Sequence, residues 1–194
     1  FPLPPIDISL VKHIPFGAGL GGGSADAAFM LKMLNEMAEL GLSDEKLEDY
    51  AVQLGADCPV FIRNKPVFAT GIGNVFSETD LSLAGYFLVL VKPDIHVSTP
   101  EAYSLVVPRK PEASLPELIK LPVEQWKDLV VNDFEKSVFA RYPQIAEIKE
   151  SLYSAGALYA SMSGSGSSVY GLFASEPEQL PAFENCFITG GELR

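Results

Sequence analysis

The sequence predicts a mixed α+β protein with two lobes. Helical and strand-like hydrophobic patterns are interspersed along it, its character changes over residues 75–98, and no repeat of fixed period occurs. Of its 194 residues, 47% are hydrophobic, which is enough apolar material for one sizeable core or two small ones. We therefore expect a first domain over residues 1–80 and a second over residues 81–194.

The patterns of the first eighty residues alternate between strand and helix. Gly41 and Gly55 are placed to end helices, and Ser43 is a good N-cap for the helix that follows it. The expected elements, in order, are a half-buried strand over 6–14, a helix over 24–40, a helix over 44–54, and short strands over 58–62 and 67–70.

The second lobe begins with a continuous apolar run over residues 86–91, which is typical of a strand buried on both faces. Helical spacing returns after residue 98. The expected elements are helices over 100–105, 124–139 and 144–154, then strands over 158–162 and 169–173 on either side of a Gly- and Ser-rich loop.

The balance of charge limits the kinds of partner. Lys and Arg number 14 against 25 Asp and Glu, a formal net charge of −11, which argues against broad binding to nucleic acid or to an anionic membrane. The two cysteines, Cys58 and Cys186, lack the spacing of a metal site or a disulfide framework. No apolar run reaches the roughly 18 residues of a membrane span. A small-molecule partner and a reducing, cytoplasmic location are expected.

A dense glycine loop is the strongest motif, with five glycines in the seven positions from Gly17 to Gly23. Without Cβ atoms, successive backbone N–H groups can converge on an anion, and a helix that starts next directs its own unpaired N–H groups the same way. A polyphosphate suits this arrangement. Ser24 is expected either to cap the helix or to offer its hydroxyl to phosphate or Mg²⁺. An ordinary flexible loop is less favoured, because so many glycines are costly in unfolded-state entropy.

Two other phosphate-binding motifs are compared with this loop. Gly17–Gly22 satisfies G-x-G-x-x-G, which leaves a dinucleotide-binding oxidoreductase open, although a capped helix rather than a second parallel strand is expected after the first helix. The P-loop pattern is excluded because the sequence contains no Gly-Lys pair. A nucleotide-binding module without catalysis also remains open.

The stretch Pro15–Ala28 resembles the second conserved motif of the GHMP kinase superfamily, in which a glycine loop wraps the phosphates of ATP. The agreement is with the branch that acts on a cytidine diphosphate-linked methylerythritol. The resemblance implies a two-lobed fold with an N-terminal lobe like ribosomal S5 domain 2, incomplete here, and a ferredoxin-like C-terminal lobe. Other stretches agree in family order along nearly the whole chain: Leu54–Phe61, Ala69–Gly73, His96–Tyr103, Asn132–Glu135 and Met162–Gly166.

The resemblance implies that the protein phosphorylates this substrate at its 2-hydroxyl with ATP, a step of the non-mevalonate isoprenoid precursor pathway. Another small-molecule kinase of the superfamily is the alternative. Asp57 would act as general base, and Ser24 would also contact Mg²⁺. The implied nucleotide-binding residues are Pro15, Gly17, Ala18, Gly19, Leu20, Gly21, Gly22, Gly23 and Ser24.

Further residues match substrate-binding positions of the family. Thr99 and Tyr103 would line the cytidine pocket, where the Tyr ring can stack on the base, although Tyr103 is also typical of a core residue. The resemblance places a loop over the phosphate-bearing centre, with substrate contacts from Asp57 and from Ser163, Gly164, Ser165 and Gly166.

Some expected family features are missing from this sequence. The family carries a Lys near the reacting hydroxyl, and a His and an aromatic residue around the cytosine, in a segment before the first motif. The chain therefore resembles an N-terminally truncated copy, and we expect it to be less active than a complete enzyme. His13 and His96 are not assigned as replacements, since a lone His in a strand or loop is more often structural or solvated. A monomer or a homodimer is expected.

Overall fold

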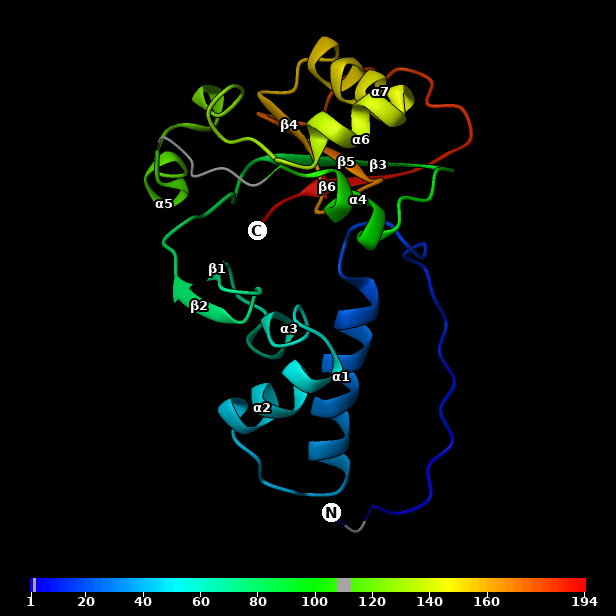
Figure 1. Cartoon of the computed structure of the whole chain (residues 1–194), viewed down its shortest axis with the longest axis vertical. Helices are drawn as coiled ribbons and strands as arrows, with labels where there is room; N and C mark the ends of the chain where they lie inside the picture. The colour runs from blue at the N-terminus through cyan, green and yellow to red at the C-terminus, as the bar shows by residue number, and fades with distance from the viewer. Residues whose placement is uncertain (2, 108–112) are drawn as a thin grey trace. The chain divides into compact units, whose positions relative to one another are not determined.

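The computed structural model describes residues 1, 3–107 and 113–194, which form two compact units (Figure 1). The first unit comprises residues 1–16 and 21–80, and the second comprises residues 17–20 and 81–194. A short piece of the glycine loop, Gly17–Leu20, therefore belongs to the second unit. No helix within the described ranges is both long and apolar enough for a membrane span.

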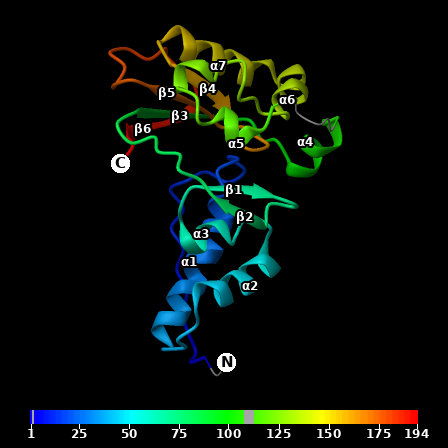
Figure 2. The same ribbon diagram turned by 90° about the vertical axis from the view of Figure 1, so that its left-hand side faces the viewer.

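The first unit consists of three helices and a β-hairpin (Figure 2). A small apolar core lies among the helices, with Ala28, Leu47 and Ile62 almost completely buried. Strands β1 and β2 pair antiparallel through a Gly-rich turn. The bounds are α1 Gly22–Met37, α2 Asp44–Leu54, α3 Val60–Arg63, β1 Val67–Thr70 and β2 Val75–Glu78.

The two predicted helices of this unit are confirmed. The Ser43 hydroxyl accepts a hydrogen bond from Lys46 N at 3.4 Å, and Gly55 caps the end of α2. Helix α1 begins two residues earlier than expected, because Gly21 adopts a left-handed conformation at the N-cap, with φ of 65°. Ser24 is consequently the third helical residue, and its predicted capping role is wrong.

Two predicted strands are wrong. Residues 6–14 are extended, yet no strand of the described residues pairs with them, and alternation alone does not satisfy backbone N–H and C=O groups. Residues 58–62 instead form a turn and most of α3, where Phe61 N and Ile62 N donate to Cys58 O and Pro59 O. Pro59 has helical φ and ψ, so the short apolar run continues as helix.

The second unit is built on a four-stranded antiparallel sheet with the order β4-β5-β3-β6, which is the strand order of a ferredoxin-like fold. The strands are β3 Phe87–Pro93, β4 Tyr159–Met162, β5 Val169–Phe173 and β6 Cys186–Glu192. The helices are α4 Thr99–Leu105, α5 Leu115–Leu118, the 3₁₀ helix η1 Val123–Gln125, α6 Glu135–Arg141 and α7 Pro143–Ser154.

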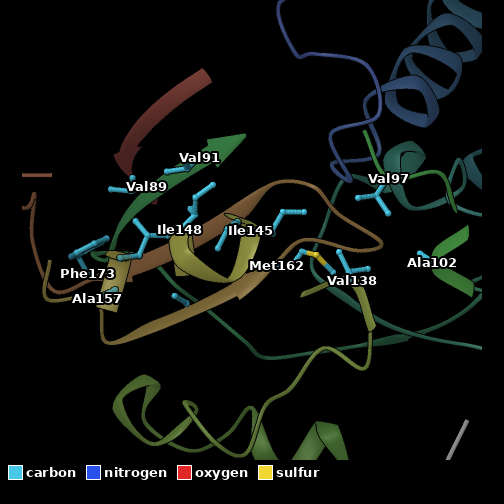
Figure 3. Close-up of a cluster of buried hydrophobic side chains, with 13 residues drawn as sticks. Val89, Val91, Val97, Ala102, Val138, Ile145, Ile148, Ala157, Met162 and Phe173 are labelled. Atoms are coloured by element: carbon cyan, nitrogen blue, oxygen red, sulfur yellow. The ribbon is translucent and has the colours of Figure 1, made fainter. Parts of the chain in front are cut away.

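Both faces of this sheet are covered, as the apolar run over 86–91 predicts. Val89 and Val91 of β3 join a cluster with Ile145 and Ile148 of α7 on one face (Figure 3). Leu88, the residue before Val89, packs against a second cluster on the other face. The strands that flank the Gly- and Ser-rich loop are confirmed as β4 and β5, and α4 and α7 confirm two predicted helices.

The single helix predicted over residues 124–139 is wrong. The segment forms η1, a series of turns and then α6. The side-chain oxygen of Asn132 accepts from Phe134 N at 3.0 Å, a local bond that competes with a continuous helix. Elements β2, α5 and β6 had no clear sequence pattern. In β6 the strand contains Gly190 and Gly191, which are poor strand formers.

Candidate functional site

The part of the glycine loop in the second unit packs against the loop Ser163–Ser168, called here the serine loop. The Ser163 hydroxyl donates to Gly19 O at 2.8 Å, and Ser168 N donates to Ala18 O at 3.2 Å. Ala18 is almost completely buried by this packing. Gly19 and Ser163 are 144 residues apart in the sequence, so two distant motifs meet in the same unit.

Two glycines of this segment have positive φ and close neighbours. Gly19 has φ of 73°, and a Cβ added to it would lie 2.6 Å from Gly166 O and closer still to Ser163 O. Gly17 has φ of 63°, and its Cβ would lie 2.5 Å from Nδ1 of His96. Positive φ favours glycine at both positions, and the close approach of backbone oxygens adds a second requirement for glycine at Gly19.

The same segment presents unused donors. Among the described residues, no oxygen accepts a hydrogen bond from the backbone N–H of Gly17, Gly19 or Leu20. Unpaired N–H groups on successive residues that include positive-φ glycines form a concave site for an anion. This geometry is the one that the glycine pattern predicts.

In the first unit, the loop continues directly into α1. The first backbone bond of the helix is Ala25 N to Gly21 O at 2.8 Å, so Gly22, Gly23 and Ser24 have N–H groups without helical acceptors. The first turn contains no acidic side chain that could accept hydrogen bonds from these N–H groups. Together with the positive end of the helix dipole, these donors favour a bound anion.

A lysine that the sequence analysis missed lies beside this helix start. The Lys12 ammonium pairs with the Asp26 carboxylate, and Nζ lies 3.6 Å from the position of a Cβ on Gly22. The ring of Phe16 lies 5.1 Å from the same ammonium group. Lys12 therefore adds a half-buried cation next to the Gly22 amide. The available clue was a basic residue three positions before Pro15, which opens the glycine loop.

Asp57 lies in the turn between α2 and α3, and its side chain is exposed. The turn is closed by Cys58 N, which donates to Gly55 O at 3.1 Å. A Cβ on Gly73, in the β1–β2 turn, would lie 3.6 Å from Oδ1 of Asp57. Within the described part of the chain no hydrogen-bond donor or cation holds this carboxylate, and its role as general base stays a prediction.

Thr99 and Tyr103 lie on α4, which Ser98 caps by accepting from Glu101 N at 3.3 Å. Tyr103 is 66% exposed, so its interpretation as a core residue is wrong. Its ring meets Phe134 edge to face, with centroids 4.9 Å apart. A cavity of about 490 Å³ begins where α4 ends; its lining includes Val107 but neither Thr99 nor Tyr103. The cytidine pocket stays a prediction.

The predicted substrate-binding loop contacts the glycine loop. Ser163 uses its hydroxyl proton on Gly19 O, and Gly166 N donates to Ser163 O at 3.0 Å. Gly164 and Ser165 lie at the turn of the loop, where Gly164 is exposed and Ser165 half-buried. Direct contact of these four residues with substrate stays a prediction.

No group of three His, Cys, Asp or Glu side chains suited to a metal ion occurs among the described residues. Ser24 is half-buried at the start of α1, and Asp26 is engaged with Lys12. Such a donor set fits Mg²⁺ only where phosphate oxygens and water supply most ligands. The dinucleotide-binding alternative is contradicted, because α2 follows α1 where that fold requires a strand.

Comparison with known proteins agrees with this geometry. A model of the GHMP kinases N terminal domain matches residues 1–65, and a model of the GHMP kinases C terminal domain matches residues 114–186. The glycine loop and Asp57 lie in the first match, and the serine loop lies in the second.

Curated relatives cover the whole chain. A 4-diphosphocytidyl-2-C-methyl-D-erythritol kinase of Bacteroides fragilis is 63% identical over 100% of this chain and 71% of its own length. That of Parabacteroides distasonis is 59% identical over 100% of this chain and 72% of its own length.

Solved structures share the fold. A crystal structure of 4-(cytidine 5'-diphospho)-2C-methyl-D-erythritol kinase matches with a TM-score of 0.76 and 29% identity, over 92% of this chain and 68% of that one. A homoserine kinase from Cytophaga hutchinsonii matches with a TM-score of 0.64 and 16% identity, over 94% of this chain and 68% of that one, and supports the fold alone.

Proposed function

Because the chain belongs to the GHMP kinase family, we propose that it transfers the γ-phosphate of ATP to the 2-hydroxyl of 4-diphosphocytidyl-2-C-methyl-D-erythritol, in the non-mevalonate isoprenoid precursor pathway. The observation that supports this most directly is the set of bare main-chain N–H groups at Gly17, Gly19 and Leu20 and again at the start of α1. Such donors suit the phosphates of a nucleotide in a protein of net charge −11.

Phosphoryl transfer requires positioning, neutralisation of charge and removal of one proton. The residues proposed to bind nucleotide are Pro15 and Gly17–Ser24. The backbone N–H groups of Gly17–Ser24 would hold phosphate oxygens without adding net charge to the protein. Lys12 supplies a cation beside Gly22. Asp57 is the proposed general base, and its exposed, unpaired carboxylate accepts the proton of the attacking hydroxyl.

The remaining assignments are proposals of the same kind. Ser24 would contribute its hydroxyl to Mg²⁺, which when bound neutralises charge on the phosphates. Thr99 and Tyr103 would contact the cytidine, and Ser163–Gly166 would contact substrate next to the glycine loop. We also propose that residues 1–80 form the ATP-binding domain and residues 81–194 the C-terminal domain. A cytoplasmic location and a monomeric or homodimeric state complete the proposal.

An assay of acceptor specificity tests the proposed function. With ATP and Mg²⁺, the protein is expected to release ADP only when 4-diphosphocytidyl-2-C-methyl-D-erythritol is added, and ³¹P NMR is expected to show a new phosphate monoester on that compound. L-homoserine, the acceptor named for a kinase of similar fold, is the comparison and is expected to give no release above background. ADP release with homoserine and none with the cytidine compound would contradict the substrate assignment.

A further inference from the structure

The serine loop is held in place by Asn132, which lies before α6. Its Nδ2 donates to Met162 O and to Gly164 O, each at 2.8 Å. Its Oδ1 accepts from Phe134 N at 3.0 Å, so the amide group is oriented by its own backbone. One side chain thus fixes the residue before the serine loop and the turn within it.

Glu135 also binds the backbone of Met162, through its N–H group. Only 8% of this residue is exposed. Its Oε1 accepts from Met162 N at 2.8 Å and from the Ser161 hydroxyl at 3.2 Å. Its Oε2 pairs with Lys149 Nζ at 2.6 Å. At the end of β4, Met162 therefore has its N–H bound by Glu135 and its carbonyl bound by Asn132, and we call this pair the clamp.

The clamp connects to the glycine loop through the serine loop. Within the serine loop, Ser163 N donates to Ser168 O at 2.8 Å. The same two residues bind the glycine loop, through the Ser163 hydroxyl on Gly19 O and Ser168 N on Ala18 O. All of these residues belong to the second unit. A continuous chain of hydrogen bonds therefore runs from Asn132 to Gly19.

We propose that Asn132 is a positioning residue for nucleotide binding. It fixes the serine loop, and the serine loop holds Gly17–Leu20 in the conformation that leaves their N–H groups free for phosphate. In this role Asn132 acts through the serine loop rather than by contact with the ligand. The role rests on the proposed function, because it concerns the shape of the phosphate-binding loop rather than a separate site.

The effect is expected on loop order more than on global stability. Asn132 is half-buried and Gly164 is exposed, so water can replace the lost donor at Gly164 O, while the sheet and α7 stay packed. Without the donor, the serine loop has more accessible conformations, and nucleotide binding must restore the productive one.

The test compares two Asn→Asp variants. N132D keeps the shape of the side chain but removes its N–H donors and places a carboxylate against two carbonyl oxygens. N35D is the matched control in the first unit, where Asn35 Nδ2 donates to Leu42 O at 3.0 Å and Oδ1 accepts from Leu42 N at 2.9 Å. Both changes remove a side-chain amide that donates to backbone carbonyl oxygens. Only Asn132 belongs to the chain of hydrogen bonds that reaches Gly19.

Two measurements are made on each protein: amide hydrogen exchange at Ser163, Gly166 and Ser168, and the Kd of a non-hydrolysable ATP analogue with Mg²⁺. In N132D we expect exchange at these amides to rise at least tenfold and the Kd to rise about tenfold, whereas N35D leaves both within twofold of the parent. If N132D does not fold, N132A is measured in its place, with the same expected changes.

The outcomes separate the two proposals. Unchanged exchange or an unchanged Kd in the Asn132 variant contradicts the positioning role, as does an equal effect of N35D. A parent protein that binds no ATP analogue contradicts the proposed function instead, and the exchange comparison still decides whether Asn132 orders the serine loop.

Discussion

Replacement of Asp57 by Asn is expected to lower kcat roughly 10²–10⁴-fold, the range over which general base catalysis contributes, with the Kd for ATP within twofold of the parent. The amide is nearly the same size as the carboxylate but cannot accept the hydroxyl proton. Because the side chain is exposed and makes no hydrogen bond within the described residues, we expect the free energy of unfolding to be unchanged. Steady-state kinetics and calorimetric titration measure the two effects.

The control for this change is Asp49→Asn. Asp49 is also an exposed carboxylate of the first unit, and its bond to Lys46 on α2 is worth little. We expect D49N to keep the parent kcat. If D57N retained the parent kcat, Asp57 would not be the general base.

Gly19→Ala is expected to raise the Kd for ATP about 10–100-fold, equivalent to about 1.4–2.8 kcal/mol. The new Cβ would lie 2.6 Å from Gly166 O and closer to Ser163 O, so one loop must move away from the other. The positive φ of 73° adds a cost of about 1–2 kcal/mol for a residue with a side chain. Calorimetric titration with an ATP analogue and Mg²⁺ measures the change.

Gly41→Ala is the control that separates the cost of positive φ from the steric clash between the two loops. Gly41 has a similar φ of 64°, but no atom lies within 4 Å of the Cβ position. G41A is therefore expected to lower stability by an amount set by φ alone and to leave the Kd unchanged. Equal affinity losses in G19A and G41A would show that general destabilisation, rather than the contact between the two loops, accounts for the effect.

Sequence patterns predicted the elements whose backbone hydrogen bonds and end caps are formed by residues nearby in the sequence. Helix α2 has a capping side chain at Ser43 and a terminating Gly55, and both act within one turn of the helix. The strand over 6–14 failed because a strand depends on a partner that alternation does not reveal. The run 58–62 was too short for periodicity to separate strand from helix.

In the candidate site, too, local features were predictable from the sequence and long-range contacts were not. The glycine pattern predicted the unpaired N–H groups, because glycine itself permits the required φ values. The roles of Lys12 and Asn132 were not predictable from spacing, since each depends on a contact: Lys12 with Asp26, and Asn132 with the end of β4 thirty residues away. Long-range hydrogen bonds leave no periodic pattern in a sequence.

The most direct test of the account is to follow the backbone amides of Gly17–Ser24 by ¹⁵N NMR during titration with a non-hydrolysable ATP analogue and Mg²⁺. We expect the N–H resonances of Gly19, Leu20 and the first turn of α1 to shift together, with one Kd, as they begin to donate to phosphate. Saturable binding of the analogue that leaves these resonances in place while others move would contradict the account.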